Sequence, residues 1–170
     1  LPSLPGRIAV VTSVPSSALA DMLRTAAERW PTTRILVVPI PVQGAVGEQI
    51  CQALTSVILQ AEGRGLDAVV LARGGGSRED LAVFDGEELA RLIAACPLPV
   101  VTGLGHEDDT TIADLVADYR AATPTAAIVA LLPERSAISQ ALGQLRTHLG
   151  QLVALRLQAE RQRQRGRQEL

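Results

Sequence analysis

Aromatic residues are almost absent from this sequence, which contains one Trp, one Tyr and one Phe among its 170 residues. Base stacking on a platform of aromatic side chains is therefore not expected as the way in which this chain binds a nucleic acid. With so few aromatic residues, the core must be built from Val, Ile, Leu and Ala. The hydrophobic fraction of 47% predicts a globular body of this kind and not a disordered chain.

Cysteine and long apolar runs are also scarce. Cys51 and Cys96 lie far apart in apolar surroundings, without the spacing of metal ligands. We interpret them as buried free thiols, which suits a reducing cytoplasm. No apolar run reaches the roughly 18 to 20 residues that cross a bilayer, and residues 1–6 do not resemble a signal peptide. These absences predict a cytoplasmic protein without a membrane partner.

Lysine is missing altogether, and all 16 basic residues are arginine. Their distribution is uneven. Residues 1–132 hold 9 Arg against 15 Asp plus Glu, a net charge of −6, whereas residues 133–170 hold 7 Arg against 3 Glu, a net charge of +4. A free-standing DNA-binding domain is usually basic, because neutralisation of phosphates supplies most of its non-specific affinity. If DNA is the substrate, a part of the protein outside residues 1–132 must help to hold it.

Residues 1–132 alternate between short apolar runs and helical periodicity. The runs 7–12, 34–40, 67–71 and 98–102 predict buried strands. Helices are predicted over 16–29, over a segment from Ile50 to Ala61 that Gly63 closes, over 87–95 and over 110–119. Such alternation is typical of an α/β fold. We expect a Rossmann-like three-layer domain over residues 1–132, with a mainly parallel sheet of at least four strands.

The unusual loops of this domain follow Thr12, Ile40, Leu71 and Thr102, where the four predicted strands end. In open parallel sheets, ligands bind beyond the carboxyl ends of the strands. The sequence therefore predicts a single active site at this edge of the sheet.

Residues 133–170 have a different character. Ile138, Leu142, Leu145, Leu149 and Leu152 recur at alternating spacings of four and three residues, the seam of a two-stranded coiled coil. The seam covers only about two heptads. From Gln158 onward the chain is almost entirely Gln, Glu and Arg, which predicts solvated helix or disorder. We expect residues 133–170 to begin a long helical, coiled-coil extension.

The loop Arg73-Gly74-Gly75-Gly76-Ser77 is a candidate phosphate-binding site. Glycines allow a ligand to approach the backbone closely, so that successive N–H groups converge on an anion. Arg73 adds a planar guanidinium suited to phosphate. The alternative is a flexible turn that carries a surface arginine, and the loop does not match the P-loop pattern.

The segment His106-Glu107-Asp108-Asp109 places one of only two histidines beside three carboxylates at the end of a strand. A histidine with a neighbouring carboxylate suits proton transfer near neutral pH. The same carboxylates could instead hold a divalent metal, or begin the next helix with Asp109 as its cap. From their positions alone, we interpret Asp21 as a solvated helix residue and His148 as a residue of the helix surface or of the coiled-coil seam.

Five motifs in order resemble the exodeoxyribonuclease VII large-subunit family. They are Val-Gln-Gly (42–44), Arg-Gly-Gly-Gly-Ser-Arg-Glu-Asp-Leu (73–81), Gly-His-Glu-Asp-Asp (105–109), Thr-Thr-Ile-Ala-Asp (110–114) and Thr-Pro-Thr-Ala-Ala (123–127). The resemblance extends from about Leu1 to Pro133, and the start of the coiled coil continues it. Departures from the family pattern occur at Ser16-Ser17, Ala82-Val83, Ala122 and Ile128, none of which removes a proposed catalytic group.

The resemblance implies a bacterial nuclease that hydrolyses single-stranded DNA to short oligonucleotides. It implies Asp21, Arg73, His106 and Asp109 as the essential residues, so that Asp21 gains a role that its own position did not suggest. Family members are described as not strictly requiring a metal, although Mg²⁺ remains possible through Asp21 and Asp109. The resemblance also implies an N-terminal OB-fold domain that this chain does not include, and a coiled coil that binds the small subunit.

Two other functions remain open at this stage. The first is a non-catalytic Rossmann-like module that holds a nucleotide or another phosphate compound without cleaving it. The nuclease and this module are distinguished by whether His106 is dispensable for ligand binding but needed for turnover. The second is a scaffold that presents the coiled coil to partners, for which none of the four residues would matter. A fold of this class does not distinguish among the three.

Overall fold

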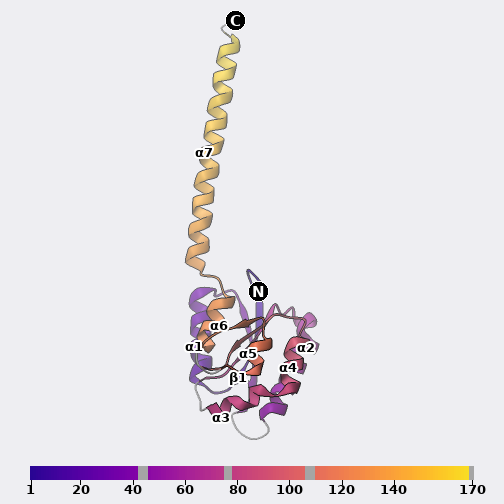
Figure 1. Ribbon diagram of the computed structural model, residues 1–170. Helices are drawn as coiled ribbons and strands as arrows, with labels where there is room; N and C mark the ends of the chain where they lie inside the picture. The colour runs from indigo at the N-terminus through magenta and orange to yellow at the C-terminus, as the bar shows by residue number, and fades with distance from the viewer. Residues whose placement is uncertain (42–45, 75–77, 106–109, 169–170) are drawn as a thin grey trace. The chain divides into compact units, whose positions relative to one another are not determined.

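The structure is a computed structural model that describes residues 1–41, 46–74, 78–105 and 110–168 (Figure 1). The chain divides into two compact units, Leu1–Pro133 and Glu134–Leu170. We call them the α/β unit and the helical unit.

A five-stranded sheet forms the centre of the α/β unit. Its strands are β1 (Arg7–Ser13), β2 (Arg34–Ile40), β3 (Ala68–Ala72), β4 (Val100–Gly103) and β5 (Tyr119–Arg120). The strand order is β2-β1-β3-β4-β5, and every described pairing is parallel. The predicted α/β class and parallel sheet are therefore confirmed. All carboxyl ends of the strands meet at one edge, which we call the carboxyl edge.

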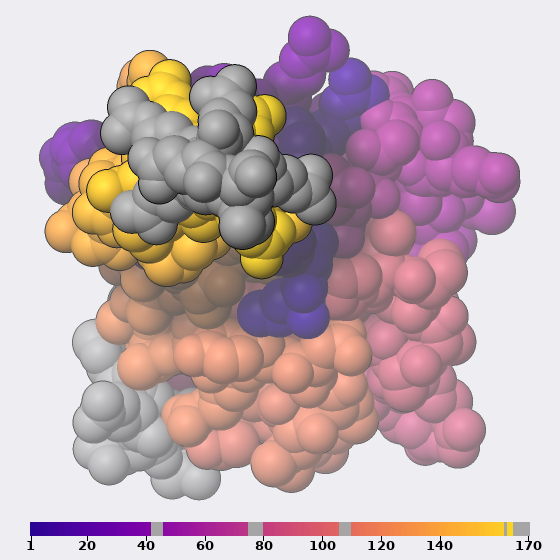
Figure 2. Space-filling model, turned by 90° about the horizontal axis from the view of Figure 1, so that it is seen from above, coloured from indigo at the N-terminus to yellow at the C-terminus, as the bar shows by residue number. Residues whose placement is uncertain are grey.

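Helices cover both faces of this sheet (Figure 1). One face carries α1 (Ser17–Arg29) and α6 (Pro124–Leu131), and the other carries α2 (Val46–Arg64) and α4 (Glu87–Ala94). Three short elements complete this unit: α3 (Arg78–Leu81), the 3₁₀ turn η1 (Ala82–Asp85) and α5 (Ile112–Val116). Both η1 and α5 contact α4, and α3 contacts η1. In Figure 2 the purple-to-magenta surface of α2 and the rose surface of α4 lie side by side on the right.

Alternation along the strands divides the core into two apolar layers. In β1, Ile8 and Val10 face α1 and α6, whereas Ala9 and Val11 face α2 and α4. All four side chains are buried. Successive strand side chains point to opposite faces, and a sheet covered on both faces needs apolar residues at every position. This requirement explains why the predicted strands are continuous apolar runs.

Element ends differ from the sequence prediction at several places. The second helix extends from Val46 to Arg64, so Gly63 lies inside it. The chain leaves this helix at Gly65, whose φ of +60° suits glycine. The predicted helix over 110–119 is shorter than expected. Its helical part is α5, and Tyr119–Arg120 form the fifth strand instead.

The N-cap of α5 is Thr111, so the alternative in which Asp109 caps this helix does not hold. Thr111 Oγ1 accepts a hydrogen bond from Asp114 N at 3.2 Å, and Asp114 Oδ2 accepts one from Thr111 N at 3.0 Å. This reciprocal capping box satisfies two backbone donors at the helix start.

The helical unit contains one helix of 34 residues, α7 (Arg135–Gln168). It continues through the polar segment after Gln158, for which disorder was the alternative. The four seam leucines Leu142, Leu145, Leu149 and Leu152 are all exposed. The coiled-coil pairing itself stays a prediction. Among the residues that the structure describes, no helix combines the length and apolarity needed to cross a membrane.

Candidate active site

A pocket of about 240 Å³ opens at the carboxyl edge of the sheet. It is lined by residues from α1, from the loops after β3 and β4, and from the start of α6: Ser17, Ala18, Asp21, Arg73, Gly74, Gly105, Thr123, Pro124 and Thr125. Three of the predicted site residues, Asp21, Arg73 and Gly74, are therefore brought together. A larger hollow of about 780 Å³ lies along α2 and contains none of the predicted site residues.

Two helix N-termini border this pocket. Ser16 caps α1, where its hydroxyl accepts a hydrogen bond from Leu19 N at 3.1 Å. Thr123 caps α6 in the same way, with a bond from Ala126 N at 3.1 Å, and Pro124 follows it. Backbone N–H groups and the helix dipole make such N-termini favourable for anions. The electrostatics of the pocket therefore suit a phosphate group.

Gly74 allows the loop after β3 to approach α1. A Cβ atom at this position would lie 3.1 Å from the Cβ of Ala18, which is tighter than an ordinary contact. The first glycine of the predicted phosphate loop therefore has a packing role. A larger residue at this position would displace the loop from α1.

Gly103 allows an even closer approach between β4 and α6. A Cβ atom here would lie 2.8 Å from the carbonyl oxygen of Thr123 and 3.0 Å from Cα of Pro124. Both are backbone atoms, so relieving this steric clash would require a shift of the whole start of α6. Gly103 thus places the N-terminus of α6 at the pocket.

Replacement of Gly103 by alanine tests this close packing. We expect Gly103→Ala to lower the free energy of unfolding by about 1–3 kcal/mol, since overpacking against backbone has no cheap relief. Thermal unfolding followed by circular dichroism measures the change. Gly63→Ala is the matched control, because nothing lies within 4 Å of a Cβ at this helical position. Alanine should be neutral or stabilising there. Equal melting temperatures for both variants would contradict this role of Gly103.

Arg73 directly follows β3 and lies largely buried, with 15% of its side-chain surface exposed. Its backbone N donates to Gly103 O at 3.1 Å, which ties the loop after β3 to the end of β4. Its Nη1 donates to Asp80 O at 2.9 Å, and its Nη2 lies 3.4 Å from Asp80 Oδ2. These contacts hold a permanent positive charge at the pocket and orient it.

Asp21 lies one turn into α1 and lines the pocket with 46% of its side-chain surface exposed. Its Oδ1 accepts a hydrogen bond from Arg24 Nη2 at 2.7 Å, an i,i+3 pair on the helix surface. The structure thus brings Asp21 to the same pocket as Arg73. Helical periodicity could not have shown this, because α1 and the loop after β3 are far apart in the sequence.

His106 and Asp109 lie outside the described residues, as do Gly75, Gly76 and Ser77. The described chain on the amino side of His106 ends at Gly105, which lines the pocket. Among the described side chains, no group of three or more His, Cys, Asp or Glu residues could hold a metal ion. Of the two predicted metal ligands, Asp21 and Asp109, Asp21 belongs to the described residues.

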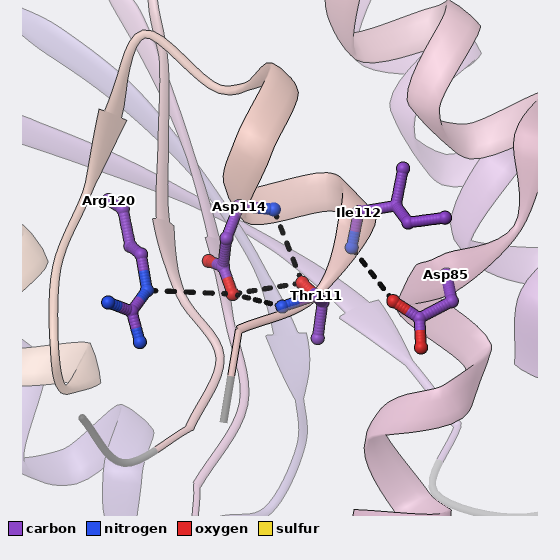
Figure 3. A network of polar contacts seen from close by, with 5 residues as sticks. All are labelled: Asp85, Thr111, Ile112, Asp114 and Arg120. Atoms are coloured by element: carbon purple, nitrogen blue, oxygen red, sulfur yellow. Dashed lines mark hydrogen bonds and ion pairs between the residues drawn. The ribbon is translucent and has the colours of Figure 1, made fainter. Parts of the chain in front are cut away.

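A polar network holds the start of α5 and joins it to β5 (Figure 3). Asp114 is the centre of this network, with 2% of its side-chain surface exposed. Its Oδ2 accepts bonds from Thr111 N and Thr111 Oγ1, the latter at 2.9 Å, and lies 3.9 Å from Nε of Arg120. On the other side, Asp85 Oδ1 accepts a bond from Ile112 N at 2.8 Å.

Sequence reasoning did not assign roles to several residues at this edge. Thr123 and Thr125 line the pocket, and their hydroxyls lie 3.1 Å apart. The Thr-Pro pair is a helix-start signal that could have marked them. The hydroxyls of Thr12 and Thr102 are buried near the ends of β1 and β4, without a hydrogen-bond partner among the described residues. No signal in the sequence distinguishes those two from ordinary strand residues.

The two cysteines are free thiols, and neither lines the pocket. Cys51 is buried as predicted, whereas Cys96 is only half-buried. Burial raises the pKa of both thiols, and the nearby carboxylate of Glu88 raises the pKa of Cys51 further. A raised pKa lowers the thiolate fraction at neutral pH. Their chemistry is therefore not that of activated nucleophiles.

Residues 1–169 match the family model described as "Exonuclease VII, large subunit". The chain is similar to curated proteins named "Exodeoxyribonuclease 7 large subunit". Identity is 66% over 163 residues in Synechococcus sp. strain CC9605, covering 96% of this chain and 42% of that protein. It is 43% over 164 residues in Desulforudis audaxviator, covering 96% and 40%. The chain thus spans about two-fifths of the length of these curated relatives.

Proposed function

Because the chain belongs to the exonuclease VII large-subunit family, we propose that it is the nuclease core of an enzyme that degrades single-stranded DNA to short oligonucleotides. The observation that carries this proposal is the pocket at the carboxyl edge. It collects Asp21, Arg73 and Gly74 from two distant segments, between two helix N-termini that favour anions. The acidic rest of the α/β unit fits an enzyme whose DNA is held largely by other parts of the protein.

In the proposed reaction, Arg73 holds the scissile phosphate. Its guanidinium and the N–H groups of the glycine loop stabilise the negative charge that develops on the phosphate oxygens in the transition state. Arg73 is anchored through Asp80, so it needs little reorganisation when the substrate arrives. Such preorganisation is the usual source of electrostatic stabilisation.

Proton transfer is assigned to His106. As general base it takes a proton from the attacking water, whose oxygen forms a bond to phosphorus while the bond to the leaving oxygen breaks. The leaving oxygen takes up a proton, either from solvent or from a protonated His106. Asp109 orients His106, and Asp21 positions the water. These assignments for His106 and Asp109 rest on residue chemistry and on the family motif.

No bound metal is strictly required in this proposal. The charge of Arg73 and the base strength of His106 supply what a metal would otherwise supply, a stabilised phosphate and an activated water. Asp21 and Asp109 are the residues that would hold Mg²⁺ if it binds.

Chelation tests the metal proposal. We expect cleavage of end-labelled single-stranded DNA to continue in EDTA, with a rate within about twofold of that without EDTA, because no step depends on a Lewis acid. The assay uses the full-length large subunit co-expressed with its small subunit. Loss of cleavage in EDTA, with recovery on addition of Mg²⁺, would show that a metal is essential and would contradict this proposal.

The partner proposed for α7 is the small subunit. The exposed leucine seam of Leu142, Leu145, Leu149 and Leu152 is an apolar stripe at heptad spacing, which favours burial against other helices.

The two free thiols suit a bacterial cytoplasm, where disulfides rarely persist.

The cleavage assay with end-labelled single-stranded DNA also separates a nuclease from a protein that only binds DNA. Release of short labelled products by the wild-type complex is the expected result. A complex that binds single-stranded DNA but never shortens it would instead support the non-catalytic phosphate-binding module, for which the same pocket is suitable.

A further inference from the structure

We propose that Thr125, in the first turn of α6, donates a hydrogen bond to a non-bridging oxygen of the phosphate that Arg73 holds, and that Thr123 positions the hydroxyl of Thr125. This inference rests on the proposed function and deepens it, because the phosphate belongs to the DNA strand that is cleaved at this pocket. It gives a role to Thr-Pro-Thr-Ala-Ala (123–127), a motif to which the proposed reaction assigns no function.

Gly103 fixes the start of α6 relative to Arg73. Its missing side chain allows the carbonyl oxygen of Thr123 to approach, since a Cβ atom would lie only 2.8 Å from that oxygen. Its own carbonyl oxygen accepts a hydrogen bond from Arg73 N at 3.1 Å. This one residue of β4 therefore joins the loop after β3 to the start of α6, and both segments line the pocket of about 240 Å³. On the same face of the sheet, α6 packs against α1, which carries Asp21 (Figure 1).

Thr125 is the polar residue of an otherwise apolar helix. The sequence of α6 is Pro-Thr-Ala-Ala-Ile-Val-Ala-Leu, so Thr125 carries its only polar side chain. The buried residues Ala127, Ile128 and Leu131 pack this helix into the core. Thr125 lies in the first turn, is half-buried and lines the pocket. The single polar side chain of the helix is thus placed at the pocket.

The hydroxyl of Thr125 has hydrogen-bonding capacity to spare. A threonine hydroxyl offers one donor and two acceptor positions. Thr123 Oγ1 uses two of these three, because it accepts a bond from Ala126 N at 3.1 Å and lies 3.1 Å from Thr125 Oγ1. Among the described residues, Thr123 is the one hydrogen-bond partner of the Thr125 hydroxyl. The two hydroxyls share one bond, so the second hydroxyl proton of the pair has no acceptor in the described part of the chain and can bind a ligand.

The direction of these bonds favours an anion at their end. Ala126 N donates to Thr123, which donates to Thr125, and the proton of Thr125 is then left for the ligand. Hydrogen bonds that run in one direction polarise one another, and this chain begins at the N-terminus of α6, where the helix dipole is positive. The carboxylate of Asp21 in the same pocket repels an anion, but it is paired with a neighbouring arginine. A neutral donor on α6 therefore complements the positive charge of Arg73.

The alternative is that the two hydroxyls only stabilise the start of α6. In that case their removal lowers the melting temperature but leaves the chemistry at the phosphate unchanged. A donor to a non-bridging oxygen acts differently, because its bond strengthens as negative charge develops on that oxygen in the transition state. Its loss therefore lowers kcat more than it weakens DNA binding.

The first experiment measures cleavage of end-labelled single-stranded DNA by the full-length large subunit co-expressed with its small subunit. Valine has the shape of threonine without the hydroxyl, so Thr125→Val removes the donor and little else. We expect this variant to lower kcat about 10- to 100-fold, with KM within about threefold of wild type. Thr125→Ser keeps the hydroxyl and should restore cleavage. The matched control is Thr55→Val on α2, where the hydroxyl donates to Cys51 O within the helix, and it should cut as wild type does.

A second experiment tests whether Thr125 contacts a phosphate oxygen. Sulfur in place of one non-bridging oxygen accepts hydrogen bonds only weakly. Wild type and Thr125→Val are therefore compared on single strands in which every linkage is a phosphorothioate of one configuration. For one of the two configurations, sulfur should slow wild type about three- to tenfold more than it slows the variant, because the variant has no donor to lose. A purely structural Thr125 would give the same sulfur effect in both proteins.

Thr123 is tested through the same sulfur effect, because loss of its cap also affects folding. Thr123→Val removes the N-cap of α6 and should lower the melting temperature, so its kinetics are measured well below the melting range. If Thr123 positions Thr125, this variant should also show a reduced sulfur effect at the configuration to which Thr125 responds. Thr123→Ser can both cap and donate, and it should restore stability and the sulfur effect. A wild-type sulfur effect in Thr123→Val would overturn the positioning role.

The outcomes separate this inference from the proposed function. If wild type degrades single-stranded DNA while Thr125→Val keeps the wild-type kcat and both sulfur effects, Thr125 is not a phosphate ligand and the proposed function stands. Equal losses of kcat in Thr125→Val and Thr125→Ser would also overturn the inference, because serine keeps the hydroxyl. If wild type does not degrade single-stranded DNA, the inference and the proposed function are overturned together.

Discussion

His106→Ala should lose cleavage by about 10²- to 10⁴-fold, the usual contribution of a positioned general base, while single-stranded DNA binding changes little. The reason is chemical. An imidazole changes its charge near neutral pH, so it can take a proton from water and return one within a single turnover. Alanine removes the base but leaves Arg73 and the helix N-termini of the pocket to hold the phosphate. The measurement is release of label from end-labelled single-stranded DNA, with binding titrated in parallel.

His148→Ala is the matched control for this variant, because His148 is the other histidine of the chain and is exposed on α7. We expect it to cut as wild type does. Undiminished cleavage by His106→Ala would remove His106 from the chemistry. An equal loss of DNA binding and cleavage would assign His106 to DNA binding and not to proton transfer.

Arg73→Ala should lower kcat/KM by about 10²- to 10³-fold, which is typical for loss of one preorganised group that stabilises transition-state charge. Arg73→Lys keeps the charge but loses the planar fork that binds two oxygens at once, so it should recover only part of the activity. The contacts of Arg73 support this expectation. A lysine ammonium cannot reproduce both the bond to Asp80 O and the second nitrogen beside Asp80 Oδ2.

Stability must be measured with these Arg73 variants, because the same contacts link α3 to the end of β3. Arg91→Lys is the matched control, an arginine-to-lysine substitution that should leave activity unchanged. Arg91 is exposed on α4 and pairs with Glu87 at 2.7 Å. Near-normal turnover by Arg73→Lys, in a variant that melts as wild type does, would refute bidentate binding of the phosphate. If Arg73→Lys loses activity and also melts at a lower temperature than wild type, an assay well below its melting range separates lost catalysis from unfolding.

Local signals predicted much of this fold. The strand over 34–40 has the predicted bounds, and Ser16 lies at the predicted start of the first helix, where it is the N-cap. Such features depend on residues within a few positions of one another, as periodicity and capping do. The loop after Leu71 also lies at the carboxyl edge as predicted, because strand direction in a parallel sheet follows from the alternation of strands and helices.

Other features were missed because they depend on distant parts of the chain. β5 has two residues and no periodicity of its own. It exists through its register with Val101 and Thr102 of β4. The partner of Asp114, Arg120, is likewise visible only when α5 and β5 are folded against each other.

By itself, the sequence determined the α/β class, the edge of the sheet at which the candidate site lies, and the family, because apolar runs, glycine loops and ordered motifs are local properties of the chain. Only the tertiary structure decided which residues share the pocket. It brought Asp21 of α1 to Arg73, and it brought the start of α6 to both, through the absence of a side chain at Gly103. The physical reason is that sheet register and close backbone packing join segments separated by tens of residues, and no local pattern encodes such contacts.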